Sequence, residues 1–130
     1  MIQESLKVAV FQLDLVWENS VANCVKIDKW LQKTDQDADI VFLPEMFSTG
    51  FSMNVSDLAE PMNGETIQWM KVRSHEYQLA LCGSLIIQDK GLYLTGLFLL
   101  NLREKLISII NVICLPWEMK KVTLNMEPNV

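Results

Sequence analysis

The chain has 130 residues, a length that fits one domain. Half of the residues are hydrophobic and 21% are charged, which favours a packed core and argues against a disordered chain. The net charge is −5 and no basic cluster is present, so nucleic acid is not expected as a partner. No segment has the apolar length of a membrane span, and the N-terminus lacks the features of a signal peptide. We therefore expect a cytoplasmic protein without a membrane partner.

The cysteines do not indicate a disulfide framework or a zinc site. Cys24, Cys82 and Cys114 are odd in number and far apart, and none belongs to a CxxC motif. The single histidine, His75, has no ligand pattern around it. We interpret Cys24 and Cys82 as packing residues and His75 as a solvated helix residue.

A strand and a helix are the first elements predicted along the chain. Residues 6–11 (LKVAVF) form an apolar run with little alternation, which predicts a strand buried on both faces or nearly so. Asn19 or Ser20 can cap a helix that runs to about Lys33. The apolar positions that recur at helical spacing are Val21, Cys24, Val25, Trp30 and Leu31.

The alternation of strands and helices continues to Leu94, in the order of an α/β domain with mixed or parallel pairing. From Thr95 the pattern changes, because the chain becomes apolar without a clear period. The predicted elements between these points are a strand at 40–43 ended by Pro44, an irregular excursion at 48–64, a helix at about 66–77, a strand at 79–87, a turn at 89–91 and a strand that begins at Leu92.

Glu45 is the candidate catalytic residue. It follows the strand at 40–43 by way of one proline, which predicts a carboxylate at the carboxyl edge of a sheet, where open α/β folds build ligand sites. Apolar surface from Met46, Phe47 and Phe51 would raise the pKa of this carboxyl by desolvation, as suits a general base that faces a thiol. The alternative is a solvated glutamate in a loop, because acidic residues are common at strand ends.

Three segments resemble the nitrilase superfamily of carbon–nitrogen hydrolases. They are KVAVFQLDLVWEN near the start, VFLPEMFSTGF around Glu45, and ALCGSLI in the strand at 79–87. LPEMF followed by TGF is the specific part, and it is most similar to the omega-amidase-like branch. The resemblance implies that residues 1–94 are the N-terminal, incomplete part of the nitrilase-type α-β-β-α sandwich.

The resemblance also implies a reaction. This branch hydrolyses the side amide of small dicarboxylic acid monoamides through a Glu-Lys-Cys triad, without a metal or organic cofactor, and its members are homo-oligomers. The glutamate of LPE is the general base of that triad, which assigns the role to Glu45. The base activates the thiol, and a lysine ammonium stabilises the oxyanion of the tetrahedral intermediate.

The lysine and the nucleophilic cysteine of the family have no counterpart here in a matching context. The family's lysine lies in a segment resembling YxKRHLF, whereas Lys120 and Lys121 have different surroundings, and Cys114 lacks the strand-to-turn context of a nucleophile. We therefore expect a chain that keeps only Glu45 of the triad and is inactive alone. The alternatives are a hydrolase that recruits Cys114 with Lys120 or Lys121, and a non-catalytic α/β binding module in which Glu45 is incidental.

A frameshift near Leu94 would explain why residues 95–130 form a tail that is not homologous to the family. Codons compatible with Ser108 to Leu115, read from the third base of each codon into the next, can encode YNKRHLF, and the shifted frame then continues as TMGNEKGHFKHGTER. Trp117 and Met119 leave almost no freedom at their positions. Such a tail would leave apolar faces exposed and strand edges unpaired, so we expect a product of low stability that aggregates readily.

Overall fold

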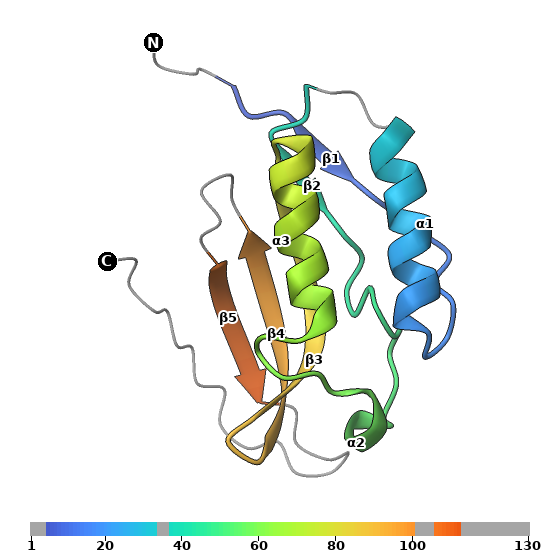
Figure 1. Cartoon of the computed structure of the whole chain (residues 1–130), viewed down its shortest axis with the longest axis vertical. Helices are drawn as coiled ribbons and strands as arrows, with labels where there is room; N and C mark the ends of the chain where they lie inside the picture. The colour runs from blue at the N-terminus through green and yellow to red at the C-terminus, as the bar shows by residue number, and fades with distance from the viewer. Residues whose placement is uncertain (1–4, 34–36, 101–105, 113–130) are drawn as a thin grey trace.

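The computed structural model describes residues 5–33, 37–100 and 106–112, the last of these by their backbone alone. Five strands form one sheet in the order β1-β2-β3-β4-β5, so that strands consecutive in the chain are neighbours in space (Figure 1). The first three strands are parallel, and β4 and β5 continue the sheet in antiparallel fashion. Their bounds are β1 Val8–Val10, β2 Ile40–Phe42, β3 Ala80–Asp89, β4 Leu92–Leu100 and β5 Leu106–Val112.

Two long helices, α1 (Ser20–Lys33) and α3 (Glu65–Tyr77), cover one face of this sheet, and the short α2 (Val55–Leu58) lies in the excursion before α3 (Figure 1). The side chain of Asn19 accepts a hydrogen bond from the backbone N–H of Ala22, so the predicted cap of α1 is confirmed. The predicted α/β class is confirmed as well. None of the helices in the described part of the chain has both the length and the apolar character needed to cross a bilayer.

The core lies between the sheet and the two long helices. Val41 of β2 is fully buried, and its register partners Ala9 and Leu81 face the helices with it. The neighbouring residues Val8 and Val10 point the other way, and 73% of Val10 is exposed. The prediction of a first strand buried on both faces is therefore wrong, because helices cover only one side of β1.

The buried side of α1 also differs from the prediction. Asn23, Ile27 and Leu31 face the core, whereas the predicted core residues Val21 and Val25 are exposed. Half of the Trp30 side chain is exposed too, although its ring packs on that of Phe11 with 5.6 Å between centroids. Asparagine takes a core position here because its amide is fully hydrogen-bonded by backbone, which apolar spacing does not reveal.

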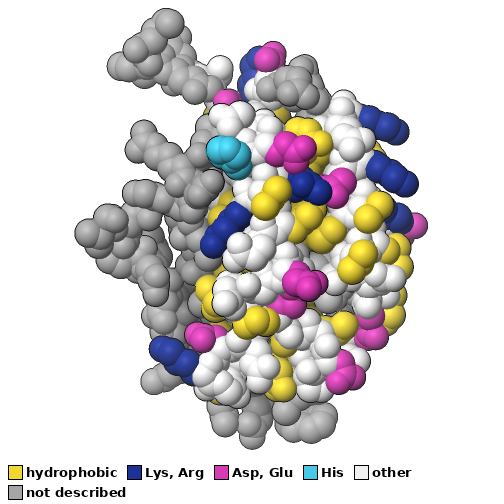
Figure 2. Space-filling model, in the orientation of Figure 1, with side chains coloured by type: hydrophobic (Ala, Val, Ile, Leu, Met, Phe, Trp, Pro, Cys, Tyr) yellow, Lys and Arg dark blue, Asp and Glu magenta, His cyan; other side chains and the backbone are white. Residues whose placement is uncertain are grey.

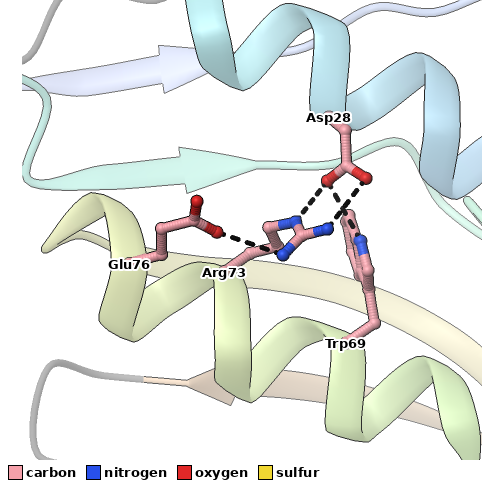
Figure 3. Close-up of polar contacts among 4 residues, drawn as sticks. All are labelled: Asp28, Trp69, Arg73 and Glu76. Carbon is pink, nitrogen blue, oxygen red and sulfur yellow. Dashed lines mark hydrogen bonds and ion pairs between the residues drawn. The ribbon is translucent and has the colours of Figure 1, made fainter.

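Polar contacts fix α1 against α3 (Figure 3). The Arg73 guanidinium donates to both carboxylate oxygens of Asp28, with N–O distances of 2.5 and 3.1 Å. The indole of Trp69 donates to the same carboxylate at 3.1 Å, and Arg73 also pairs with Glu76 at 3.0 Å. The carboxylates raise the pKa of Arg73 further, chiefly through the hydrogen bond with Asp28, so the guanidinium stays charged in this bidentate contact.

A hairpin joins β3 to β4. Lys90 and Gly91 both have positive φ, 50° and 77°, which is the geometry of a two-residue hairpin turn and agrees with the predicted turn. The domain boundary that we predict at Leu94 falls inside β4, whose residues pair with β3 in unbroken register from Leu92 to Leu100. Phe98 and Leu100 on this strand are fully buried. The division at that point and its origin in a frameshift stay predictions.

Candidate functional site

Glu45 stands at the carboxyl end of β2, three residues beyond Phe42, the last paired position of that strand, as its place in the sequence predicts. Its side chain is exposed and lines a hollow of about 340 Å³ on the face of the sheet opposite the helices. Strand alternation puts Phe42, Cys82 and Leu97 on that face. The full lining consists of Phe42, Leu43, Glu45, Cys82, Gly83, Ser84, Thr95 and Leu97.

A tight turn holds Glu45 in place. The next residue, Met46, has φ = 53°, a left-handed conformation that is unusual for a non-glycine residue. Its N–H donates to the hydroxyl of Ser84 at 2.7 Å, and its carbonyl accepts from the N–H of Gly50 at 2.7 Å. Gly50 itself has φ = 75°, which glycine adopts without strain. Ser84 on β3 thus anchors the backbone that directs Glu45 into the hollow.

The buried amide of Asn23 supports the same turn from α1. It accepts from the N–H of Val16 at 2.7 Å and donates to the carbonyls of Val16 and Ser48, both at 2.8 Å. Glu18 adds a second link, because its N–H donates to the carbonyl of Thr49 at 2.9 Å. Sequence reasoning missed Asn23 and Ser84. The only signal for either was a polar residue inside an otherwise apolar helix face or strand.

The three apolar residues predicted to surround Glu45 do not do so. Met46 and Phe47 are buried, but they pack into two separate core clusters instead of enclosing the carboxylate. Phe51 is exposed. Gly83 explains the position of Phe47, because a Cβ on Gly83 would lie 2.6 Å from the phenyl ring. Phe47 therefore turns inward to pack across β3, and the carboxylate of Glu45 remains accessible to water.

Cys82 shares the hollow with Glu45, and burial raises the pKa of its thiol. Cys24 lies on α1 facing α3; burial, followed by the nearby charges of Asp28 and Glu60, raises the pKa of its thiol to about 12. Both thiols are protonated at neutral pH and are poor nucleophiles. This agrees with their interpretation as packing residues.

Of the remaining candidates from the sequence, the structure describes only His75. His75 is exposed on α3, and Cys114, Lys120 and Lys121 lie outside the described residues. Among the residues that the structure describes, no lysine or arginine contributes to the lining of the hollow. Within the described ranges no three residues of metal-binding type come together. The hollow therefore offers a carboxylate that can accept a proton, beside a surface of mostly apolar side chains.

Comparison with known proteins gives the family. A sequence profile described as carbon-nitrogen hydrolase matches residues 7–123. The omega-amidase YafV of Yersinia enterocolitica is 36% identical over 83 residues, which are 64% of this chain and 32% of the relative. The omega-amidase YafV of Escherichia coli K12 is 32% identical over 88 residues, 66% of this chain and 33% of the relative. The chain thus spans about a third of the length of these curated relatives.

The fold agrees. The crystal structure of XC1258 from Xanthomonas campestris, a CN-hydrolase superfamily protein, superposes with a TM-score of 0.79 at 24% identity. The match covers 84% of this chain and 41% of the other, so the sheet and helices described above form one part of that fold. The predicted fold, an incomplete nitrilase-type sandwich, is confirmed. With the profile covering most of its length, the chain belongs to the carbon–nitrogen hydrolase family.

Proposed function

We propose that this chain derives from an omega-amidase-like hydrolase in which Glu45 is the general base. The main support for this proposal is the position of Glu45, which belongs to the LPEMF segment and lines the hollow at the carboxyl end of β2. The similarity to omega-amidases supports the reaction class. The intact hydrolase would act in the cytoplasm as a homo-oligomer on the side amide of a small dicarboxylic acid monoamide.

The chemistry requires two more groups in addition to this carboxylate. Glu45 takes the proton of a cysteine thiol, and the thiolate forms a bond to the amide carbon while a lysine ammonium stabilises the oxyanion. The proton returns to the departing nitrogen, which leaves as ammonia. Glu45 then deprotonates a water molecule that cleaves the thioester, releasing the carboxylic acid and the free thiol. An exposed carboxylate held by a rigid turn suits a group that exchanges protons twice.

We propose further that the chain as written lacks the lysine and the cysteine and is inactive alone. The two cysteines within the described residues have raised pKa values, which supports this proposal because neither thiol is activated. The shifted reading of the codons for Ser108 to Leu115 would restore a YNKRHLF segment that carries the lysine. Loss of one base near the codon for Leu94 would account for the absence of this lysine segment from the chain.

The test compares two genes, the coding DNA as it stands and the same DNA with one base restored at Leu94. The restored frame is continued past the codon for Val130, because up to that codon it encodes the lysine but no cysteine. Ammonia release from the ω-amide of a dicarboxylic 2-oxo acid should be absent for the first and present for the second. In the restored protein, Glu45→Gln should lower kcat/KM by about 10²–10⁴-fold. The matched control is Asp57→Asn, an exposed carboxylate on α2 outside the hollow, which should leave the rate unchanged.

Three outcomes would contradict the proposal. Turnover by the chain as written, abolished by Cys114→Ala, would show that the tail supplies its own nucleophile. An intact reading frame in the coding DNA, relative to close homologues, would remove the frameshift. A restored protein whose rate does not respond to Glu45→Gln would remove the assignment of the base.

A further inference from the structure

A groove of about 830 Å³ runs between β1 and α1, and it shares no lining residue with the hollow that contains Glu45. Six consecutive residues, 9–14, form one side of it, and α1 forms the other. We name it the β1 groove. Its apolar surface comes partly from Trp30 and Phe11, whose rings pack together. The groove has no role in the proposed amidase chemistry.

The backbone along this groove is the edge of the sheet. β1 is the first strand in the sheet order, with β2 as its one strand neighbour among the described residues. The N–H of Ile40 donates to the carbonyl of Lys7, and the N–H of Phe11 donates to the carbonyl of Phe42. Backbone groups alternate in direction along a strand, so those of Val8 and Val10 point away from β2 toward the open edge. Such an edge is a template for an added strand.

The α1 side of the β1 groove is positively charged, although the chain as a whole carries −5. Lys26, Lys29 and Lys33 line it, and Asp14 is the one acidic residue in the lining. Lys26 donates to the backbone carbonyl of Asp14 at 2.6 Å. Neither Lys29 nor Lys33 has an ion-pair partner in the described part of the chain. Lys and Arg side chains gather along the outer side of the molecule over α1 (Figure 2).

The spacing of these lysines fits a strand that carries acidic residues at alternate positions. Along a helix axis, residues three and four apart are separated by about 4.5 and 6 Å. Same-side residues on a strand are about 6.6 Å apart. A strand paired with β1 would direct every second side chain toward α1. These side chains would therefore lie opposite successive lysines at a similar interval.

We propose that the β1 groove binds an extended acidic segment of another polypeptide, which pairs with β1 as an additional strand and directs alternate Asp or Glu side chains at Lys29 and Lys33. Backbone pairing supplies affinity and the lysines select the charge. A second copy paired edge to edge is disfavoured, because a two-fold contact through β1 would bring two lysine rows together. The proposal is independent of the role of Glu45.

The test uses the full chain and an acetylated six-residue peptide of alternating glutamate and valine. Binding by calorimetry should weaken at least about tenfold for the double variant Lys29→Glu, Lys33→Glu, because two attractions become repulsions. The matched control is Lys71→Glu with Lys90→Glu, two lysines outside the groove, which should bind as the original chain does. A peptide that alternates lysine and valine should not bind.

Backbone pairing has its own readout. Amide hydrogen exchange at Val10 should slow when the acidic peptide binds, whereas Phe11, already bonded to β2, should change little. A peptide with methylated amides on the pairing side should lose binding. Equal binding of the methylated peptide, or of glutarate, would show a simple anion pocket and overturn the proposal. Unchanged affinity of the Lys29, Lys33 double variant for the acidic peptide would also overturn the proposal. A dimer of the chain that the peptide does not dissociate would overturn it as well.

Discussion

The two faces of the sheet have similar strand residues but different surroundings. On the face under α1 and α3, Val41, Leu81 and Phe98 are fully buried. On the opposite face, Val10 and Phe42 are 73% and 39% exposed, although both are as apolar as their neighbours. Alternation along a strand decides which residues share a face, and the layer that packs across decides which face becomes a core. The hollow with Glu45 lies on the open face, and the carboxylate there is accessible to water.

The largest expected effect is a loss of packing on the covered face. Phe98→Ala should lower the free energy of unfolding by about 3–5 kcal/mol, since a fully buried ring would leave a cavity. Phe42→Ala on the open face is the matched control and should change it by no more than about 0.5 kcal/mol. Urea titration measures both values. Similar losses for the two variants would mean that the open face is also packed in solution.

Loss of the buried amide that links α1 to the turn of Glu45 ranks second. Asn23→Ala should cost about 1–3 kcal/mol, because the carbonyls of Val16 and Ser48 lose a buried donor. Asn54→Ala is the control, since the Asn54 side chain makes no capping bond at α2. Urea titration measures the free energy of unfolding of both variants, and the value for Asn23→Ala should be the lower one. If the two variants proved equally stable, the hydrogen bonds of the Asn23 amide would contribute no net free energy to folding.

The reactivity of the Cys24 thiol tests whether this side chain is buried in the folded chain. With a pKa of about 12, Cys24 in the folded chain should react with iodoacetamide roughly 30-fold more slowly at pH 8 than in urea; the scarcity of thiolate is partly offset by its greater nucleophilicity. A raised folded pKa means that the stabilisation is fully present below about pH 9 and is lost as the pH rises toward about 12. Cys24→Ser should remove this alkaline loss. Fast labelling of the native chain would contradict the burial of Cys24.

The smallest thermodynamic effect is expected on the open face. Val10→Thr with Leu97→Thr should leave the unfolding free energy within about 0.5 kcal/mol yet raise the concentration at which the chain aggregates, because exposed apolar surface is reduced. Light scattering and a thermal melt measure the two properties. A monomeric original chain that melts cooperatively in the ordinary mesophilic range would contradict the expected low stability.

Local chemistry made much of the fold predictable. The run at 40–43 ended by Pro44, the cap at Asn19, and Lys90 with Gly91 in a hairpin turn each act over a few residues. The position of Glu45 at the strand end follows from the same short-range reasoning. The resemblance of LPEMF to the hydrolase family was confirmed by comparison, whereas the catalytic role of Glu45 stays a proposal.

The direction of side chains relative to distant segments depends on tertiary contacts. Asn23 lies inside α1's core face because carbonyls from other segments satisfy its amide. Phe47 turns away from Glu45 because Gly83, far along the chain, leaves room for its ring. The order of strands and helices and the place of the carboxylate could be predicted from the amino-acid sequence, since these depend on periodicity and turn chemistry. Burial depends on contacts between residues remote in sequence, so only the assembled sheet and helices established which apolar residues form the core.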